Sequence, residues 1–255
     1  MSHAILTGHS RGLGAAVAAE LLTRGVRVLG LARGGNPALA QAHPGRLAEV
    51  SIDLADAAAL LRWLDGGTLA RFVAAAGRVL LINNAGLLQP VGPLGGQDAA
   101  AIARALGVNV LAPLALANAL VAARPAATDC RILHVSSGAA RKAYAGWSVY
   151  GATKAALDQH ARAVAADALP GVRICSLAPG VLDTGMQAEV RASGPERFPA
   201  RERFAALARE GRLVPPQDAA RQLVAHLLSE DFGREAVADL RELPPAAVDE
   251  ARARR

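Results

Sequence analysis

Tyr150 and Lys154 are the residues whose types and spacing most directly suggest chemistry. They lie four positions apart at the start of an alanine-rich stretch that predicts a helix, so their side chains share one helix face. A phenol has a pKa of about 10, and a nearby ammonium group stabilises its phenolate, which brings proton transfer closer to neutral pH. The pair could therefore exchange a proton with a carbonyl or hydroxyl group of a substrate.

The composition of the chain makes this pair unusual. Only Lys142 and Lys154 are lysines among the 28 basic residues, and the chain has 2 tyrosines. A guanidinium, with a pKa above about 12, could not shuttle a proton in place of the lysine. The alternative interpretation is a surface aromatic beside a lysine whose alkyl chain covers apolar surface. The scarcity of both residue types favours the chemical interpretation.

A glycine-rich turn follows the first apolar run of the chain. The segment TGHSRGLG at residues 7–14 leads directly into a helical stretch. Glycines allow a tight turn and a close approach of the backbone to a pyrophosphate, which the amides of a helix N-terminus attract. Such turns also end strands for structural reasons, but the position between a strand and a helix supports dinucleotide binding. The candidate contacts are Gly8, Ser10, Arg11, Gly12, Leu13 and Gly14.

Short apolar runs alternate with alanine-rich stretches along the chain, which is typical of strands joined by crossover helices. The predicted strands are residues 3–7, 26–32, 47–52, 79–83, 131–136, 173–177 and 236–239. The predicted helices are residues 12–24, 56–76 with a break at Gly66 and Gly67, 98–124 with interruptions, 149–168 and 216–228. We therefore expect an α/β fold, a single-domain, Rossmann-type, doubly wound parallel sheet of about seven strands with helices on both faces.

One catalytic domain is predicted over residues 1–243. Within it, residues 185–212 are charged, contain Pro195 and Pro199, and follow a strand end, where ligands bind in open α/β sheets. This segment is predicted to cover the substrate, and an ordinary surface excursion is the alternative. Residues 244–255 form a predicted basic C-terminal tail.

The spacing of Gly8, Gly12 and Gly14 resembles that of the short-chain dehydrogenases/reductases, and differs from the more general G-x-G-x-x-G fingerprint. The resemblance extends over nearly the whole chain, through motifs that occur in order at the expected ends of elements. These motifs are Asp53-Leu54, Asn83-Asn84-Ala85-Gly86, Asn109, Ser136-Ser137, Tyr150-Gly-Ala-Thr-Lys154, and Pro179-Gly180 through Thr184. The resemblance implies an oxidoreductase that uses a nicotinamide dinucleotide to interconvert carbonyl and hydroxyl groups.

The same resemblance implies that Tyr150, Lys154, Ser137 and Asn109 are catalytic. Ser137 would hydrogen-bond the substrate carbonyl and polarise it, while Ser136 could merely cap the strand end. Asn109 would orient a water molecule next to Lys154. Without the other motifs, an isolated asparagine in a helix would indicate a kink or a buried hydrogen-bonding residue.

Cofactor contacts are implied in the same way. Thr184 would contact the nicotinamide carboxamide, and Asp53 and Leu54 would contact the adenine. Residues 83–86 would form the loop beside the cofactor, or would serve the sheet more than the ligand. The remaining predicted contacts are Arg33, Asn84, Ala85, Gly86, Tyr150, Lys154, Pro179, Gly180 and Val181.

The end of the second predicted strand indicates which nicotinamide cofactor is used. An NAD site normally has an acidic residue there to bind the ribose 2′-hydroxyl, whereas this strand ends in Gly30-Leu31-Ala32-Arg33. Arg33 offers a planar, permanent cation to a 2′-phosphate, and Arg11 resembles the other basic position of NADP-preferring members. Both could be ordinary surface charges in an arginine-rich chain. Together with the missing acid they favour NADP(H).

Residues 136–140, 146–150 and 179–187 resemble the sepiapterin reductase and benzil reductase branch of the family, which implies an α-dicarbonyl substrate. Trp147 and Met186 could form an apolar wall for a ring, or belong to the core. The predicted substrate contacts are Ser137, Trp147, Tyr150 and Met186.

Two alternatives to benzil-type reduction follow from the sequence. Sepiapterin reductases hold the pterin with a C-terminal acid, whose nearest equivalents are Asp239 and Glu242. The longer Glu242 favours a diketone or quinone-like carbonyl over a pterin. The other alternative is a non-catalytic dinucleotide-binding regulator on the same fold, which the intact set of catalytic residues argues against.

Composition and charge favour a globular protein with a small-molecule partner. The chain of 255 residues is 52% hydrophobic and 3% aromatic, which is a globular composition. Its net charge of +6 comes from scattered arginines, with one dense cluster at residues 252–255, so we expect no nucleic-acid partner. Pro113 and Asn118 interrupt the longest apolar run, so no membrane span is predicted. The N-terminus predicts no signal peptide.

Cysteine usage suggests the compartment. Cys130 and Cys175 lie in predicted buried strands, where a thiol acts as a small hydrophobe. We therefore expect free thiols, a reducing environment and a cytoplasmic location. No metal site is predicted. The family resemblance further implies a homodimer or homotetramer built on the helices that contain Asn109 and Tyr150.

Overall fold

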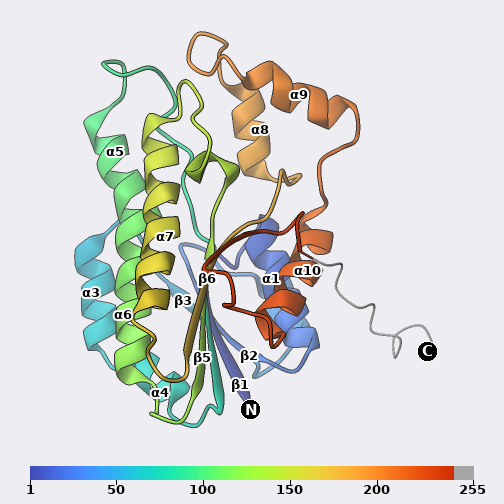
Figure 1. Ribbon diagram of the computed structural model, residues 1–255. Helices are drawn as coiled ribbons and strands as arrows, with labels where there is room; N and C mark the ends of the chain where they lie inside the picture. The colour runs from blue at the N-terminus through green and yellow to red at the C-terminus, as the bar shows by residue number, and fades with distance from the viewer. Residues whose placement is uncertain (244–255) are drawn as a thin grey trace, which may run out of the picture.

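The computed structural model describes residues 1–243, and its centre is one sheet of parallel strands (Figure 1). The strand order is β3-β2-β1-β4-β5-β6-β7. The strands are β1 (Ser2–Thr7), β2 (Arg27–Ala32), β3 (Leu47–Ser51), β4 (Arg78–Asn83), β5 (Asp129–Val135), β6 (Val172–Ala178) and β7 (Val237–Asp239). The predicted α/β fold with a doubly wound parallel sheet is confirmed, and each predicted strand is present with ends that differ by at most two residues.

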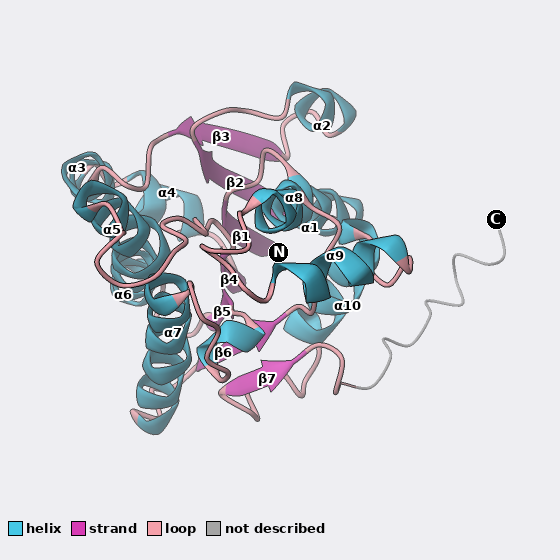
Figure 2. Cartoon of the chain, turned by 90° about the horizontal axis from the view of Figure 1, so that it is seen from above, coloured by secondary structure: helices cyan, strands magenta, loops and turns pink. Residues whose placement is uncertain are grey.

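Helices cover both faces of the sheet (Figure 2). One face carries α1 (Gly12–Thr23) and α10 (Pro216–Leu228). The other carries α3 (Ala57–Asp65), α4 (Thr68–Val73), α5 (Ala99–Leu106), α6 (Ala112–Ala123) and α7 (Ser148–Ala166). The break predicted at Gly66 and Gly67 separates α3 from α4. A short helix that the sequence did not predict, α2 (Pro37–Ala42), starts at Asn36, whose side chain accepts a hydrogen bond from the Leu39 amide.

Successive side chains along a strand point to opposite faces of the sheet, which divides the apolar residues between two core layers. Leu6 and Ile82 belong to the layer under α1 and α10, whereas Ile5 and Leu81 belong to the layer under α3, α4, α6 and α7. All four side chains are at most 1% exposed. Burial on both faces is the reason that these strands appear in the sequence as continuous apolar runs.

The sequence predicted a helix with interruptions over residues 98–124. The structure has a continuous helix over Ala99–Ala123. A π-helical turn, Gly107–Leu111, joins α5 to α6, and Pro113 lies in the first turn of α6, where a missing amide hydrogen costs little. Our expectation that Pro113 and Asn118 interrupt this apolar stretch was therefore wrong. By length and composition alone, the 25-residue helix could cross a membrane, but half of its most apolar window is buried inside the molecule. That burial is the ordinary property of a core helix.

Residues 185–212 contain two helices that the sequence did not predict, α8 (Gly185–Ala192) and α9 (Arg201–Arg209). In Figure 1 they lie above the carboxyl ends of the strands. Phe198 between them is fully buried and Phe204 of α9 is 8% exposed. These two rings attach the segment to the rest of the molecule.

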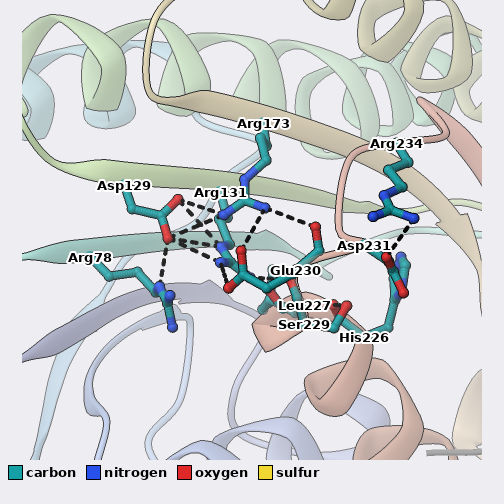
Figure 3. Close-up of polar contacts among 10 residues, drawn as sticks. All are labelled: Arg78, Asp129, Arg131, Arg173, His226, Leu227, Ser229, Glu230, Asp231 and Arg234. Atoms are coloured by element: carbon teal, nitrogen blue, oxygen red, sulfur yellow. Dashed lines mark hydrogen bonds and ion pairs between the residues drawn. The ribbon is translucent and has the colours of Figure 1, made fainter.

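At the opposite end of the sheet, Arg131 of β5 is fully buried in a charged cluster (Figure 3). Its Nη1 donates to the carbonyl oxygens of Leu227 and Ser229, at 2.8 and 2.7 Å. Asp129 pairs with Arg131 and with two further arginines, Arg78 of β4 and Arg173 of β6. The cluster therefore joins three strands to the end of α10. The predicted basic tail, residues 244–255, lies outside the described residues.

Candidate active site

A cavity of about 1040 Å³ lies at the carboxyl ends of the strands. It includes the loops after β1 and β4, where the strand order reverses, the usual ligand crevice of such a sheet. Every residue that the sequence predicted for cofactor or substrate contact lines this cavity, and so do Ser137, Tyr150 and Lys154. Asn109 is the exception, since it is fully buried behind the cavity wall.

The glycine-rich turn is tightly folded against the neighbouring strand. Gly8 and Gly12 have φ angles of 71° and 55°, which favour glycine. A Cβ atom on Gly14 would overlap the carbonyl oxygen of Gly8. The amides of the first turn of α1 have no side-chain cap, and Gly12, Leu13 and Gly14 line the cavity. An uncapped helix N-terminus at a cavity fits the phosphates of a dinucleotide.

Asn84 holds this turn in place. Its Nδ2 donates to the carbonyl oxygens of Thr7 and Gly8, at 2.9 and 3.2 Å. The hydroxyl oxygen of Thr7 accepts hydrogen bonds from the amides of Asn84 and Ala85, both at 3.0 Å. The contacts that Asn84 makes thus tie β4 to β1, which agrees with the alternative that this motif serves the sheet.

Sequence reasoning missed a buried contact beside the turn. His9 is fully buried, and its Nε2 lies 2.7 Å from Oε1 of Glu49 on β3. Gly30 of β2 makes room for the imidazole, because a Cβ there would overlap the His9 ring. Glu49 also accepts a hydrogen bond from the Asn36 amide at 2.6 Å. The carboxylate of Glu49 is therefore held by these two contacts, and it does not line the cavity.

Arg11 and Arg33 are exposed and line the cavity beside the turn. Within residues 1–243, neither arginine forms an ion pair. Across from them, a hydrogen bond from the Ala55 amide lowers the pKa of Asp53, with help from Arg104. Leu54 is 5% exposed. These residues form a polar rim with one apolar wall at this end of the cavity.

Tyr150 and Lys154 point into the middle of the cavity from α7. The two side chains are 6% and 4% exposed, and Lys154 Nζ lies 5.9 Å from the centre of the Tyr150 ring. Nζ donates to the carbonyl oxygen of Val135 at 2.8 Å. Burial lowers the pKa of Lys154 to about 8, with the charge of Asp158 acting in the opposite direction.

The acidity of Tyr150 differs from the expectation. Burial raises the pKa of Tyr150, and a hydrogen bond with the Ser137 side chain only partly opposes this. We expected Lys154 to bring this pKa toward neutrality. The prediction was wrong because loss of hydration disfavours a phenolate strongly and the ammonium does not contact the ring directly.

Asn109 lies in the π-helical turn and ties it to the cavity wall. Its Oδ1 accepts from the Leu87 amide and its Nδ2 donates to the Leu87 carbonyl oxygen, both at 2.8 Å, and Nδ2 also donates to Thr153 at 3.1 Å. A Cβ on Gly86 would lie 3.5 Å from Lys154 Nζ and 3.6 Å from Asn109 Oδ1. The amide and the ammonium therefore face the same small space. That Asn109 orients a water molecule there stays a prediction.

Asp158 is a buried carboxylate that the sequence did not single out. It lies four residues after Lys154 on α7 and is 2% exposed. Its Oδ1 accepts from the hydroxyl groups of Ser136 and Ser176, both at 2.7 Å, and its Oδ2 pairs with Arg141 Nε at 3.0 Å. Ser136 thus does more than cap a strand end, because it fixes the end of β5 to α7 through Asp158.

An aromatic cluster borders the cavity on the side of α9. Trp147 is stacked on Phe198, with ring centres 4.3 Å apart, and meets the Tyr150 ring edge-on at 5.4 Å. Tyr144 and Phe204 complete the cluster. Trp147 and Met186 line the cavity and also pack in this cluster. Both therefore belong to the core at the cavity wall, and their contact with a substrate ring stays a prediction.

Asp239 is held by a close neighbour. Both of its carboxylate oxygens accept from Arg241, at 2.8 and 2.6 Å, and this hydrogen bonding lowers its pKa. Pro179, Gly180, Val181 and Thr184, which follow β6, line the adjoining part of the cavity together with Glu242. Within residues 1–243, no group of three His, Cys, Asp or Glu side chains could hold a metal ion.

Comparison with known proteins identifies related sequences and structures. The family model for short chain dehydrogenases matches residues 2–194. The benzil reductase ((S)-benzoin forming) of Bacillus cereus is 32% identical, with 91% of this chain and 96% of the relative covered. The sepiapterin reductase of Meriones unguiculatus is 34% identical, with 89% of this chain and 92% of the relative covered. A crystal structure of a short-chain dehydrogenase/reductase from Burkholderia vietnamiensis is 50% identical in sequence and has a TM-score of 0.70. The match covers 95% of this chain and 98% of the Burkholderia chain.

Fold and site together define an oxidoreductase that uses a nicotinamide dinucleotide. The doubly wound sheet supplies the crevice, and the uncapped helix N-terminus lies at one end of it. The chain belongs to the short-chain dehydrogenase family, whose model matches most of its length. The resemblance to the branch with benzil and sepiapterin reductases is confirmed as well.

Proposed function

We propose that this protein is an NADPH-dependent carbonyl reductase that acts on an α-dicarbonyl compound of the benzil type. The observation that carries the proposal is that the phenol of Tyr150, the ammonium group of Lys154 and the hydroxyl group of Ser137 line one cavity, with Tyr150 and Lys154 buried. A phenol that keeps its proton at neutral pH is suited to give that proton to a carbonyl oxygen. The similarity to two benzil reductases, both 32% identical, supports the substrate class.

The residues of the cavity divide the chemical work among them. When bound, NADPH supplies the hydride for the carbonyl carbon. Tyr150 donates its proton to the carbonyl oxygen as negative charge develops there, and the hydroxyl group of Ser137 stabilises that charge by a hydrogen bond. The ammonium group of Lys154, 5.9 Å from the centre of the Tyr150 ring, would stabilise the phenolate that remains after this transfer. Asn109 holds the adjoining backbone and faces the space beside Lys154, where a water molecule could return the proton.

Preference for NADPH is proposed from the two arginines at the cavity rim. Arg33 and Arg11 offer charge-assisted hydrogen bonds to a 2′-phosphate, and Glu49, which contacts His9, does not line the cavity. The double variant Ala32→Asp/Arg33→Ala is expected to raise the Michaelis constant for NADPH far more than that for NADH. Equal effects on both cofactors would contradict this part of the proposal.

The proposed activity is tested with the purified protein and a panel of carbonyl compounds that includes benzil and sepiapterin. We expect oxidation of NADPH with benzil and its loss in Tyr150→Phe. No NADPH oxidation by the wild type with any compound would refute the reductase function. A pterin is the less favoured substrate, because Arg241 already holds Asp239. Binding of NADPH without turnover would instead favour a dinucleotide-binding regulator.

We further propose a cytoplasmic location, a catalytic domain over residues 1–243 with residues 185–212 covering the substrate, and a homodimer or homotetramer. The free buried thiols of Cys130 and Cys175 support a reducing compartment. Met186 and Phe204, which line the cavity from α8 and α9, support the covering role. Light scattering of the purified protein distinguishes a monomer from either assembly.

A further inference from the structure

Both lysines and both tyrosines of the chain line the same cavity. Tyr150 and Lys154 are accounted for by proton transfer, but Tyr144 and Lys142 are not. Lys142 Nζ lies 5.8 Å from the centre of the Tyr144 ring. The chain uses arginine for nearly every basic position. Its second lysine, Lys142, lies at the same cavity as Lys154.

A second cation, from a different segment of the chain, contacts the same tyrosine. Arg203 of α9 donates from Nη1 to the Tyr144 hydroxyl group at 3.3 Å. Lys142 and Arg203 are both exposed and both line the cavity. Within residues 1–243, neither of them forms an ion pair, whereas the nearby Arg141 does. In the described part of the chain, two cations thus have no counterion at one edge of the cavity, where they raise the local concentration of an anionic ligand.

The acidic residues that line the cavity near β7 and α8 lie next to groups other than Lys142 and Arg203. Asp239 accepts two hydrogen bonds from Arg241, and Glu189 accepts one from Gln89 at 2.8 Å. Glu242 lies close enough to Arg241 to raise its pKa. Within the described residues, none of these carboxylates forms an ion pair with Lys142 or Arg203.

A row of packed aromatic rings connects the two cations to Tyr150. Tyr144 packs on Trp147, with ring centres 5.2 Å apart, and Trp147 packs on Tyr150 at 5.4 Å. The cations are therefore two ring contacts away from the proposed proton donor. Arg11 and Arg33 belong to a different part of the cavity, after β1 and β2. A ligand that spans this distance needs an apolar body with a charged end.

We propose that the substrate is an aromatic ketone that carries a carboxylate, with the carboxylate bound by Lys142 and Arg203. The inference rests on the proposed reductase function and narrows its substrate class. The apolar body of the substrate lies along Trp147 and Met186, and the ketone reaches Tyr150. Charge-assisted hydrogen bonds from an ammonium and a guanidinium then hold the carboxylate.

The test compares two substrates that differ only in charge, 4-carboxybenzil and its methyl ester. We expect the wild type to have about tenfold higher kcat/KM for the acid, since two exposed cations each contribute about three- to fivefold. Lys142→Gln and Arg203→Gln are each expected to lower the ratio of acid to ester by about three- to fivefold, through KM and not through kcat. Added salt should lower the ratio as well.

Two control variants separate the local contact from general charge. Lys142→Arg keeps the cation and is expected to keep the ratio. Arg209→Gln removes a charge from the same helix as Arg203, but Arg209 pairs with Glu202 and does not line the cavity, so the ratio should not change. A ratio near one in the wild type, or a ratio that neither Lys142→Gln nor Arg203→Gln lowers, would overturn the inference.

A binding measurement keeps the inference separate from the proposed function. Isothermal titration with the carboxylated benzoin and its methyl ester measures affinity without turnover. Tighter binding of the acid that is lost in both glutamine variants supports the anion site, even if neither ketone is reduced and the reductase proposal fails. Equal binding of acid and ester overturns the anion site, even if both ketones are reduced.

Discussion

Replacing Asp158 with asparagine removes one buried negative charge and almost no volume. The serine hydroxyl groups of Ser136 and Ser176 can still donate to the amide oxygen, but the amide nitrogen would face Arg141 Nε, which is also a donor. Removing one partner of a buried ion pair costs about 3–5 kcal/mol. The side chain of Arg141 is 33% exposed, so water offsets part of this. We expect a loss of about 2–3 kcal/mol, which lowers Tm by roughly 5–10 °C in a chain of this size.

The same substitution is expected to change the pH dependence of activity. The charge of Asp158 raises the pKa of Lys154 against the effect of burial, so its removal lets that pKa fall below its value of about 8. Reduction needs Lys154 in its protonated form, and activity is therefore lost as the pH rises through this pKa. In Asp158→Asn the alkaline loss of kcat/KM should begin at a lower pH. Rates with benzil and NADPH from roughly pH 6 to 10 measure the shift.

Asp167→Asn is the matched control for Asp158→Asn. Asp167 is an exposed residue that directly follows α7, and it forms no ion pair within residues 1–243. The control should leave both Tm and the alkaline limb where they are. If Asp158→Asn behaves like this control, Asp158 neither holds the end of β5 nor acts on Lys154, and the argument fails.

Three further changes have expected outcomes. Gly14→Ala forces a Cβ against a backbone oxygen and should weaken NADPH binding at least about tenfold, a loss of roughly 1.4 kcal/mol. In the control Gly96→Ala, the new Cβ makes only an ordinary contact at 3.7 Å, so NADPH binding should not change. Fluorescence titration with NADPH measures both affinities. Arg131→Met should lower the free energy of unfolding in urea by about 2–4 kcal/mol, and Arg173→Met, whose side chain is 30% exposed, by less than about 1 kcal/mol. Burial lowers the pKa of His134 to about 3. Between this pH and about 6.5 only the unfolded chain binds a proton at His134, so the free energy of unfolding falls as the pH falls. In His134→Gln, urea titrations should show a pH dependence of the free energy of unfolding that is smaller by up to about 1.4 kcal/mol per pH unit.

The strands and the long helices could be predicted because each is defined by its own apolar pattern. β1 and β4 are buried on both faces and appear as unbroken apolar runs. α2 has no buried residue and depends on the Asn36 cap, so it leaves no pattern to detect. α9 buries Phe204 alone. The continuity of α5 and α6 depends on the π-helical turn before Pro113, a backbone adjustment that no residue type announces.

The residues of the candidate site also fall into those that a local sequence pattern predicts and those that only the folded chain brings together. Residues fixed by short motifs, such as Gly14, Arg33 and Lys154, were predicted and do line the cavity. Asp158 was missed because its partners come from β5, β6 and the loop that carries Arg141, which are distant in sequence. The ring of Phe198 was missed for the same reason, since its contact with Trp147 joins segments that no local pattern connects.

The acidity of Tyr150 shows why spacing alone could not settle the chemistry. A spacing of four residues brings Lys154 close, which argues for a lowered phenol pKa. Folding also buries both groups, and burial raises the pKa of Tyr150 while lowering that of Lys154. Burial therefore favours the neutral form of each group. A tyrosine that keeps its proton, beside a lysine that can still carry a charge below about pH 8, is in the protonation state that reduction of a carbonyl requires.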